Sequence, residues 1–522
     1  MCHGSLCGRK ARLMRALISV SNKEGIVPFA QELARLGVEI ISTGGSYQHL
    51  TDNDIAVTNV SDITKFQECL DGRVKTLHPA IHAGILAMRS NPEHMETLEQ
   101  LEIKPIDLLV INLYPFKETI SNPSATLAEA IENIDIGGPT MLRAGAKNYQ
   151  DVAVVTDPRD YDLVLSQLKE SGKVSPDTKF YLATKVFEET SFYDGLIAQY
   201  LREVQGTQFP EKYTIPLERA QSLRYGENPH QSACFYRDPI AKGGTIADCV
   251  QESGKELSYN NINDANAAVL LVKEFNEPCV VAIKHSTPCG VAVATDLSTA
   301  YQHAYDCDPQ SIFGGIVATN QIVDLATAQE MHKIFLEVII AKGFTSEALT
   351  LLKGKQNLRL LQLDGIDLPQ TPSYTMRKVG GGMLVEEGDW QPLSLEYQVV
   401  TNRTPTEREL ADMMFAMKVC KHTGSNAIVF AKDGATLSVG GGQVSRVWAV
   451  EHCVNHTLAP ATGGVMASDA FFPFPDSVEL AGKAGITAII QPGGSKADQS
   501  CIDACNHLGI SMIFTGRRHF KH

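Results

Sequence analysis

The chain has 522 residues, of which 43% are hydrophobic and 20% are charged, as in ordinary globular proteins. This length favours roughly two to four domains, and the composition excludes a disordered or fibrous chain. The net charge of −14 disfavours general binding to nucleic acids or anionic membranes. Anionic ligands would therefore require basic residues to gather locally.

The cysteine pattern and the lack of long apolar runs indicate the compartment. Twelve cysteines are scattered without a C-x-x-C pair, which disfavours a zinc ribbon or a thioredoxin-type motif. No apolar run approaches the ~20 residues that span a bilayer. The N-terminal segment lacks the apolar stretch and the cleavage site of a secretory signal. We expect a cytoplasmic protein without nucleic-acid or membrane partners.

The first block alternates strands with helices. Residues 16–20 form a short apolar run typical of a strand, and an amphipathic stretch to Leu36 predicts a helix that Gly37 ends. A second strand is expected over 38–42. This alternation favours a parallel sheet, in which ligands bind beyond the carboxyl ends of the strands.

Two polar segments follow these strands and together could hold a phosphate. They comprise Ser21, Asn22, Lys23, Thr43, Gly44, Gly45 and Ser46. Hydroxyls, a lysine and glycine-exposed backbone N–H groups at a helix start suit an anion. Ser-Asn is also a common helix cap and Gly-Gly a common turn, so both interpretations stay open.

Further along, Arg73 and Lys75 are brought together with a hydroxyl. His78 and His82 are four residues apart, but without an H-E-x-x-H motif they do not favour a metal site. An apolar strand over 106–113 ends at Tyr114. From the residues alone, Tyr114 is better interpreted as a core side chain than as an acid/base group.

A capping box at Thr126 opens a helix. Asp135 precedes a Gly-Gly-Pro segment that predicts the start of another helix. Arg143 and Lys147 would share one face of that helix, either as solvated charges or as functional groups.

The second block begins after a connector near 205–216. It contains two Lys-His-hydroxyl tripeptides, 284–286 and 421–423, which lie 137 residues apart. A Phe-centred loop follows each of them, and a hairpin is expected at Asp433-Gly434. We interpret the pattern as an internal duplication that yields two similar α/β subdomains.

A Lys-His pair at a strand end is suited to acid/base chemistry. The neighbouring ammonium would keep the imidazole neutral and able to accept a proton, although a surface lysine beside a core histidine explains the pattern equally well. Zinc deaminases require P-C-x-x-C, and Pro288-Cys289 has a single cysteine, so we expect no catalytic metal.

Nine strings in order resemble one family. They are SVSNKEG, STGG, DGRVKTLHP, NLYPF, ENIDIGGPTMLRAGAKN, LRYGENPHQ, IKHSTPCG, SDAFFPF and the Arg-rich carboxyl end. They resemble the bifunctional 5-aminoimidazole-4-carboxamide ribonucleotide (AICAR) formyltransferase / inosine monophosphate (IMP) cyclohydrolase family of purine biosynthesis. Residues 1–13 lie outside the resemblance, and 353–396 contribute no motif.

The resemblance implies an α/β fold with a doubly wound, methylglyoxal-synthase-like domain over 14–212. Residues 213–522 would hold two duplicated cytidine-deaminase-like subdomains, roughly 213–370 and 371–522. The carboxyl-terminal region would transfer a formyl group from 10-formyltetrahydrofolate, the cosubstrate, to AICAR. The amino-terminal domain would then close the ring with loss of water. The family forms homodimers with formyltransferase sites at the interface.

The resemblance also implies the residue roles. Cyclohydrolase chemistry falls on Lys75, Tyr114, Asp135 and Lys147, with the phosphate on the two polar segments above together with Arg73 and Thr76. In formyl transfer His285 would be the base, Lys284 would stabilise charge and Asn426 would orient the carboxamide. Nucleotide contacts match Arg224, Tyr225, Gly314, Glu337, Arg446, Phe471 and Arg518. Folate contacts match Val447, Asp476, Ser495 and Lys496.

Two alternatives compete with this interpretation. The chain could be a formyltransferase only, with a structural amino-terminal domain. That domain could instead be a phospho-ligand-sensing module, since methylglyoxal-synthase-like folds also serve that way. The presence of Lys75, Tyr114, Asp135 and Lys147 argues against the first alternative.

Overall fold

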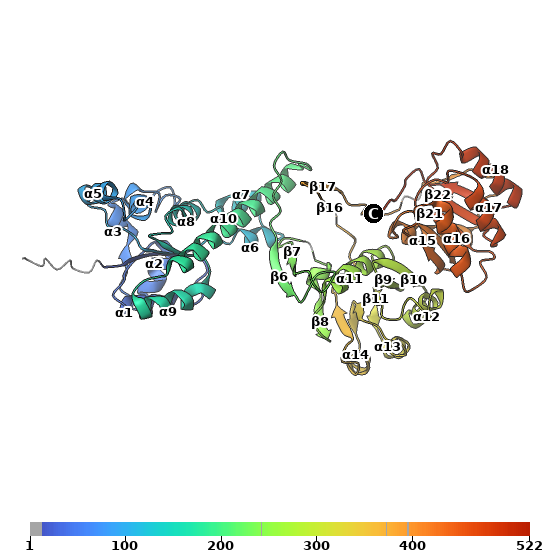
Figure 1. Ribbon diagram of the computed structural model, residues 1–522, viewed down its shortest axis with the longest axis horizontal. Coiled ribbons are helices and arrows are strands. Elements are labelled where there is room, and N and C mark those ends of the chain that lie inside the picture. Colours follow the sequence, from blue (N-terminus) through green and yellow to red (C-terminus); the bar gives the residue numbers. More distant parts are fainter. Residues whose placement is uncertain (1–12, 242, 372, 394–395) are drawn as a thin grey trace, which may run out of the picture. The chain divides into compact units, whose positions relative to one another are not determined.

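A computed structural model describes residues 13–241, 243–371, 373–393 and 396–522 (Figure 1). The first twelve residues, for which the sequence predicts no secretory signal, lie outside this range. The chain divides into two compact units. The first runs to Glu218 and includes Asp238–Ile240, whereas the second comprises Arg219–Arg237 and Ala241–His522. None of the helices in the described ranges is long and apolar enough to cross a bilayer.

The first unit contains a five-stranded parallel sheet in the order β3-β2-β1-β4-β5. Its strands are β1 (Arg15–Val20), β2 (Glu39–Ser42), β3 (Thr58–Asn59), β4 (Leu108–Asn112) and β5 (Ala153–Val155). Its helices are α1 (Ile26–Arg35), α2 (Gly44–Thr51), α3 (Val60–Thr64), α4 (Pro79–Leu86), α5 (Pro92–Gln100), α6 (Phe116–Ser121), α7 (Leu127–Glu132), α8 (Gly137–Lys147), η1 (Pro158–Asp160), α9 (Tyr161–Ser171) and α10 (Pro176–Gln205).

Both faces of this sheet are covered by helices (Figure 1). Ile18 of β1 packs in a core with α1 and α9, and its neighbour Leu17 packs in a second core with α8 and α10. Successive strand residues point to opposite faces, so burial of both faces explains why residues 16–18 of β1 are all apolar. The predicted doubly wound α/β fold is confirmed for this unit. The predicted capping box at Thr126 is also present, at the start of α7.

The second unit contains a twelve-stranded sheet in the order β18-β23-β22-β21-β19-β20-β10-β9-β11-β13-β15-β8. Its strands are β8 (Val250–Ser253), β9 (Cys279–Lys284), β10 (Thr287–Val293), β11 (Ile316–Thr319), β13 (Val338–Ala341), β15 (Arg359–Gln362), β18 (Gln398–Val399), β19 (Ile428–Lys432), β20 (Ala435–Gly440), β21 (Val465–Ser468), β22 (Ala488–Gln491) and β23 (Ser511–Phe514). Three two-stranded sheets accompany it: β6 (Glu218–Leu223) with β7 (Ala233–Arg237), β12 (Ile322–Val323) with β14 (Gly343–Phe344), and β16 (Tyr374–Val379) with β17 (Gly382–Glu387).

Helices cover both faces of the large sheet. They are η2 (Ile246–Asp248), α11 (Tyr259–Val272), α12 (Leu297–Cys307), α13 (Leu325–His332), α14 (Ser346–Lys353), α15 (Glu407–Lys421), α16 (Arg446–His456), α17 (Asp476–Lys483) and α18 (Asp498–Leu508). Helices α11 and α15 pack on one face around a shared core. Helices α12–α14 and α16–α18 pack in two separate cores, one for each half of the sheet.

The strand order confirms the predicted internal duplication. Read outward from the centre, β10-β9-β11-β13-β15-β8 matches β20-β19-β21-β22-β23-β18. The N-cap residues Ser258 of α11 and Thr406 of α15 are 406 − 258 = 148 residues apart. The turn after β9 holds residues 285 and 286, and the turn after β19 holds residues 433 and 434. These turns are also 148 residues apart, since 433 − 285 and 434 − 286 both equal 148. The resemblance to cytidine-deaminase folds stays a prediction.

The two Lys-His pairs are not equivalents in this duplication, and that part of the sequence interpretation is wrong. The first pair ends β9 and begins a turn, whereas Lys421 ends helix α15. The structural counterpart of Lys284-His285 is Lys432-Asp433, at the offset of 148. The similarity of the two tripeptides is therefore a coincidence of composition.

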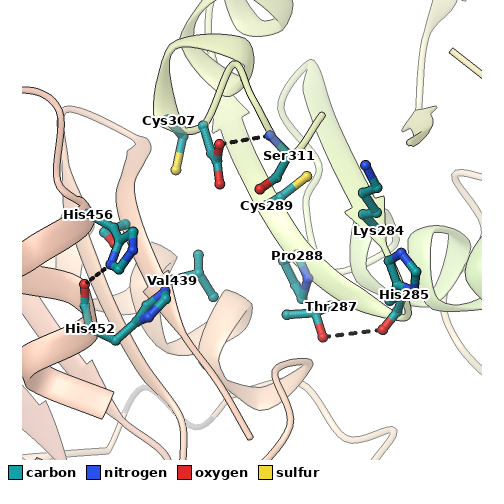
Figure 2. A pocket seen from close by; sticks show the side chains of 12 residues that line it. Lys284, His285, Thr287, Pro288, Cys289, Cys307, Ser311, Val439, His452 and His456 are labelled. Carbon is teal, nitrogen blue, oxygen red and sulfur yellow. Dashed lines mark hydrogen bonds between the residues drawn. The ribbon is translucent and has the colours of Figure 1, made fainter. Parts of the chain in front are cut away.

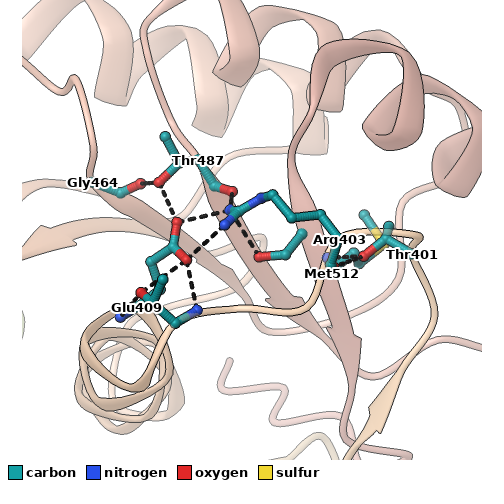
Figure 3. A network of polar contacts seen from close by, with 8 residues as sticks. Thr401, Arg403, Glu409, Gly464, Thr487 and Met512 are labelled. Carbon is teal, nitrogen blue, oxygen red and sulfur yellow. Dashed lines mark hydrogen bonds and ion pairs between the residues drawn. The ribbon is translucent and has the colours of Figure 1, made fainter.

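A buried carboxylate ties the start of α15 to the strands beside it (Figure 3). Glu409 accepts hydrogen bonds from both terminal nitrogens of Arg403, at 2.7 and 2.9 Å, and from the Thr487 hydroxyl at 2.6 Å. Burial alone would raise the pKa of Glu409, but hydrogen bonds from Arg403, Thr487 and Thr406 lower it to about 2. The ionised form is thus strongly favoured in the folded state.

Replacement of Glu409 by glutamine is expected to lower the melting temperature of the second unit at pH 7 by about 2–4 °C. The pKa of Glu409 is below its ordinary value of 4.5 in the folded chain. The stabilisation is therefore present above that pH and is lost as the pH falls toward 2. Thermal unfolding of both proteins between pH 7 and 3 measures the effect. Glu407→Gln, an exposed neighbour, is the control, and a difference that persists unchanged at pH 3 would contradict the assignment.

Candidate active sites

A cavity of about 590 Å³ lies at the carboxyl ends of β1, β2 and β4. In the order β3-β2-β1-β4-β5, the chain runs outward in both directions from β1 and β4, so this position is the topological switch point of the sheet. Ligands of open parallel sheets bind there. The volume suits a small organic ligand.

One wall of this cavity is built for an anion. The Lys23 ammonium contacts the Val20 carbonyl and lies 2.9 Å from the Ser46 hydroxyl. Burial lowers the pKa of Lys23. Helix α2 begins at Gly44 after the N-cap Thr43, whose side chain makes no capping hydrogen bond. The first N–H groups of α2 are therefore available to a ligand, and the positive end of the helix dipole favours a negative charge.

The loop before α4 brings a second lysine to the same wall. A Cβ atom at Gly44 would lie 3.2 Å from the Lys75 ammonium nitrogen, so this nitrogen sits against the start of α2. It also lies 3.4 Å from a carboxylate oxygen of Glu68. The Thr76 hydroxyl would be 2.9 Å from a Cβ at Gly137, so the loop and the start of α8 approach closely where glycine leaves room.

Tyr114 and Asp135 complete the cavity. Tyr114 is 45% exposed, so the interpretation of this residue as a core side chain is wrong. Asp135 accepts a hydrogen bond from the Gly138 N–H at 2.8 Å. Burial raises the pKa of the Asp135 carboxyl, and the Gly138 bond opposes this shift. A carboxyl with a raised pKa beside a phenol and a lysine is equipped to move protons.

Most residues predicted for this site line the cavity. They are Ser21, Lys23, Thr43, Gly44, Gly45, Ser46, Arg73, Lys75, Thr76, Tyr114 and Asp135. Asn22 adjoins it, since its N–H donates to the Asn112 side chain at 2.9 Å. Lys147 is exposed and does not line the cavity, because it ends α8 whereas Gly137, which does, begins that helix.

The sequence interpretation missed two residues of this site. The Asn112 side-chain oxygen accepts hydrogen bonds from the N–H groups of Ser21 and Asn22, and so shapes the loop after β1. Glu132 pairs with the Arg73 guanidinium. A polar residue at the end of an apolar strand was a signal for Asn112. No local pattern connects Glu132 with Arg73, which is 59 residues away.

A second cavity, of about 230 Å³, lies between β10 and β20 in the second unit (Figure 2). These strands pair at Ala292 and Ala435. The cavity lies between the start of β10 and the end of β20. One side is formed by Lys284, His285 and the start of β10, and the other by Ser438, Val439 and two histidines of α16. The cavity therefore opens at the centre of the duplicated sheet.

Lys284 and His285 stand at the end of β9, beside this cavity. The Lys284 ammonium donates to the Phe313 carbonyl at 2.8 Å. His285 is exposed and its backbone has φ 54°, in the left-handed region. The first Lys-His pair thus presents both side chains to solvent and to the cavity.

The second Lys-His pair is buried instead. His422 Nε2 and the Lys421 ammonium both lie 2.9 Å from the same carboxylate oxygen of Glu274. Burial lowers the pKa of His422, and Glu274 opposes this shift. Glu274 follows α11 and His422 follows α15, so the pair ties the two halves of the unit together. The interpretation as a core histidine holds for this pair.

Asn426 and Arg446 form a polar cluster at the start of β19. The Arg446 guanidinium donates to the Asn426 side-chain oxygen at 2.6 Å, to the Ser468 hydroxyl at 2.8 Å and to Asp469 at 2.5 Å. Arg446 is buried, and these three polar partners fix its position. The amide of Asn426 also donates to the Gln443 carbonyl at 2.8 Å, so its orientation is set.

The remaining predicted residues follow the same edge of the large sheet. Phe471 and Asp476 come after β21, Ser495 and Lys496 after β22, and Arg518 after β23. Val447 lies in the first turn of α16. Because β9 and β19 are separated by β20 and β10, the polar cluster lies at least about 14 Å from His285, at ~4.8 Å per strand.

The other four candidates for nucleotide contacts belong to the first of the two duplicated halves. Gly314 precedes β11, and Glu337 precedes β13. Glu337 accepts a hydrogen bond from Asn261 at 2.8 Å. Arg224 and Tyr225 follow β6, with the guanidinium 5.5 Å from the centre of the Tyr225 ring. Burial lowers the pKa of Arg359, Glu337 raises it and Arg224 lowers it, so these charged groups are neighbours.

Comparison with known proteins identifies the family. A model described as "AICARFT/IMPCHase bienzyme" matches residues 145–456, and one described as "MGS-like domain" matches 25–140. The "Bifunctional purine biosynthesis protein PurH" of Caldicellulosiruptor saccharolyticus is 57% identical over 97% of this chain and 99% of its own. Proteins of the same name from Acetivibrio thermocellus (57%, 98% and 100%) and Bacillus cereus (53%, 97% and 99%) are similar. The chain belongs to the AICARFT/IMPCHase bienzyme family.

Membership of this family confirms the predicted resemblance and the bifunctional character of the enzyme, a transferase and a hydrolase. The alternative of a formyltransferase with a sensing domain is disfavoured, since the bifunctional relatives match over nearly their full length. The MGS-like match falls in the unit with the 590 Å³ cavity. Within the described ranges, no group of three or more His, Cys, Asp or Glu side chains could hold a metal ion.

Proposed function

We propose that the two cavities divide the two reactions of the bienzyme between them. The first unit closes the ring of formyl-AICAR to give IMP, and the second transfers the formyl group from 10-formyltetrahydrofolate to AICAR. The observation that carries this division is the 590 Å³ cavity, which combines an anion-binding wall with Lys75, Tyr114 and Asp135. Ring closure of a nucleotide needs both features.

In ring closure, the carboxamide nitrogen attacks the formyl carbon and a molecule of water is then lost. The phosphate binds at Lys23, Ser46 and the start of α2. Lys75 stabilises the oxyanion that develops on the formyl oxygen, as a positioned cation does in acyl chemistry. Tyr114 and Asp135 move the protons that leave the nitrogen and reach the departing hydroxyl. Arg73 and Thr76, which also line the cavity, complete the phosphate contacts.

In formyl transfer, the weakly nucleophilic amine of AICAR attacks the formyl carbon and N10 of the folate leaves. His285 accepts the amine proton, Lys284 stabilises the tetrahedral oxyanion and Asn426 orients the carboxamide. The nucleotide contacts are Arg224, Tyr225, Gly314, Glu337, Arg446, Phe471 and Arg518. The folate contacts are Val447, Asp476, Ser495 and Lys496. Neither step assigns a role to a metal.

We further infer a cytoplasmic homodimer whose formyltransferase sites are shared between two copies. All six residues of β16 are exposed, among them Tyr374, Met376 and Val379. A two-stranded hairpin is marginally stable on its own in water, so a partner surface is expected to cover it. The separation between His285 and Asn426 along one sheet edge also suits sites completed by a second copy. The free cysteines of the described ranges suit a reducing compartment.

We expect residues 14–218 to fold alone and to cyclise formyl-AICAR without folate. The sequence places the boundary at 212, but Lys117 pairs with Glu218 at 2.7 Å and Pro216 packs against Gly195. The fragment 14–212 lacks these contacts and should melt at a lower temperature. Ring closure followed by absorbance and thermal unfolding of both fragments tests this. A folded 14–218 fragment that does not cyclise would contradict the division of labour.

A further inference from the structure

The turn that carries His285 has an unusual sequence for its shape. His285 and Ser286 are the two residues between β9 and β10, where Lys284 pairs with Thr287. Their φ values are 54° and 58°, so both adopt the left-handed conformation of a type I′ turn. Asn-Gly and Asp-Gly are typical of this turn, because most side chains are strained there. The serine in particular needs external support.

Asp264 of α11 supplies that support with one carboxylate. Its Oδ2 accepts a hydrogen bond from the His285 N–H at 3.0 Å. Its Oδ1 accepts hydrogen bonds from the Ser286 N–H at 2.8 Å and from the Ser286 hydroxyl at 3.0 Å. Asn263 donates to that same hydroxyl at 2.8 Å. Hydrogen bonds to an ionised acceptor are the stronger kind, so the turn is firmly held.

The duplicated half contains the same support under a different turn. Asp412 of α15 accepts hydrogen bonds from the Asp433 N–H at 2.9 Å and the Gly434 N–H at 2.8 Å. Asp412 is 148 residues after Asp264, the offset that relates the halves. Here the turn has the typical Asp-Gly sequence. Its Gly434 carbonyl accepts a hydrogen bond from the Val293 N–H at 2.9 Å, which closes the strands together.

The strand pair β10–β20 therefore has two different ends, and His285 lies at the open one. Where Gly434 closes one end, the other end opens into the 230 Å³ cavity that His285 lines (Figure 2). His285 and Ser286 are strained in this turn, whereas the equivalent turn has the ordinary pair Asp433 and Gly434. Strained residues at a cavity point to a functional constraint on the turn.

We propose that Asp264 is a positioning residue for formyl transfer. Its carboxylate holds the His285-Ser286 turn left-handed and thereby fixes the direction in which the imidazole of His285 meets the amine of AICAR. Asp264 acts through the backbone of His285 and does not touch the substrate. The proposal rests on the proposed role of His285 as the base, and its test separates the two.

The primary variant is Asp264→Ala in the full-length enzyme, assayed with AICAR and 10-formyltetrahydrofolate. We expect kcat to fall by about 10–100-fold, since misplacement of a reacting group by ~1 Å can cost this much. The KM for AICAR should change by less than about threefold, because the variant removes orientation rather than binding. Asp264→Asn, which keeps one acceptor oxygen, should show a smaller loss and serves if the alanine variant does not fold.

A second substitution supplies the rescue. Ser286→Gly gives the turn a residue that adopts positive φ without strain, as Gly434 does in the other half. In the Asp264→Ala background it should restore at least about fivefold of the lost kcat. The matched control is Asp412→Ala, which removes the equivalent support from the Asp433-Gly434 turn and should leave kcat within about twofold. Equal kcat losses in Asp264→Ala and Asp412→Ala would overturn the proposal.

A cycle with His285→Ala distinguishes failure of this proposal from failure of the proposed base. If His285→Ala alone keeps full formyl transfer, the assignment of the base is wrong. If His285→Ala is impaired and Asp264→Ala lowers kcat by the same factor with and without the histidine, the base stands and Asp264 acts by another route. We expect no further loss of kcat from Asp264→Ala once His285 is absent, as for residues that act as a unit.

Discussion

Replacement of His285 by alanine is expected to lower the kcat of formyl transfer by on the order of 10²-fold or more, the usual effect of losing a general base. His285 is exposed at the cavity between β10 and β20, which Lys284 also lines. Ring closure of supplied formyl-AICAR should be unchanged, since its cavity belongs to the first unit. Steady-state assays of both reactions at saturating substrates measure the two effects.

His422→Ala is the informative comparison, because it alters the other Lys-His pair. His422 is buried against Glu274, so its loss should lower the melting temperature. Lys421 still neutralises Glu274 in this variant. The kcat of formyl transfer per folded molecule should therefore fall by less than about tenfold. A larger loss in His422→Ala than in His285→Ala would reverse the assignment of the base.

Lys75→Ala is expected to lower ring closure by about 10²–10⁴-fold, or about 3–5 kcal/mol of barrier. The Lys75 ammonium sits against the start of α2, in the cavity that also holds Tyr114 and Asp135. Formyl transfer should continue, so the full-length variant should accumulate formyl-AICAR. Chromatographic separation of AICAR, formyl-AICAR and IMP during the coupled reaction detects this. Formation of IMP at the wild-type rate would remove Lys75 from the mechanism.

Lys147→Ala tests the remaining predicted lysine. The sequence predicts the same loss of ring closure for it, and that prediction stands. Its Cα lies about 15 Å along α8 from Gly137, at 1.5 Å per residue. A loss as large as that of Lys75→Ala would give Lys147 a role in ring closure although it does not line the cavity of its own chain. Wild-type cyclisation in Lys147→Ala would instead leave Lys75, Tyr114 and Asp135 as the chemical set.

The parts of the fold that depend on local pattern were predictable. The strand near 16–20, the helix ending near Leu36 and the capping box at Thr126 each depend on residues close in sequence. The position of the first site followed, because parallel strands present their carboxyl ends at one edge. The environment of Tyr114 was not predictable, since a residue after a strand faces the core or a cavity according to the segments packed around it.

Which residues of the two halves are equivalent was also not predictable from the sequence. The shared features of the two halves are the capping residues, Asp264 with Asp412, and two turns of the same shape. These turns differ in residue type, so no repeated string marks them. The repeated Lys-His string lies at a strand end in one half and at a helix end in the other. Structural equivalence here lies in backbone conformation and hydrogen bonds, which many side chains can satisfy.

The contact of Glu274 with His422 has a consequence for the history of the second unit. The two residues are 422 − 274 = 148 apart, so they occupy the same position in the two halves, and they touch. In a symmetric dimer of identical ancestral halves, one residue type would have faced itself at this point. An acid can face a base at this point only because the two halves are not identical in sequence. Separating the two halves would expose Glu274 and His422 to solvent and would remove their contact.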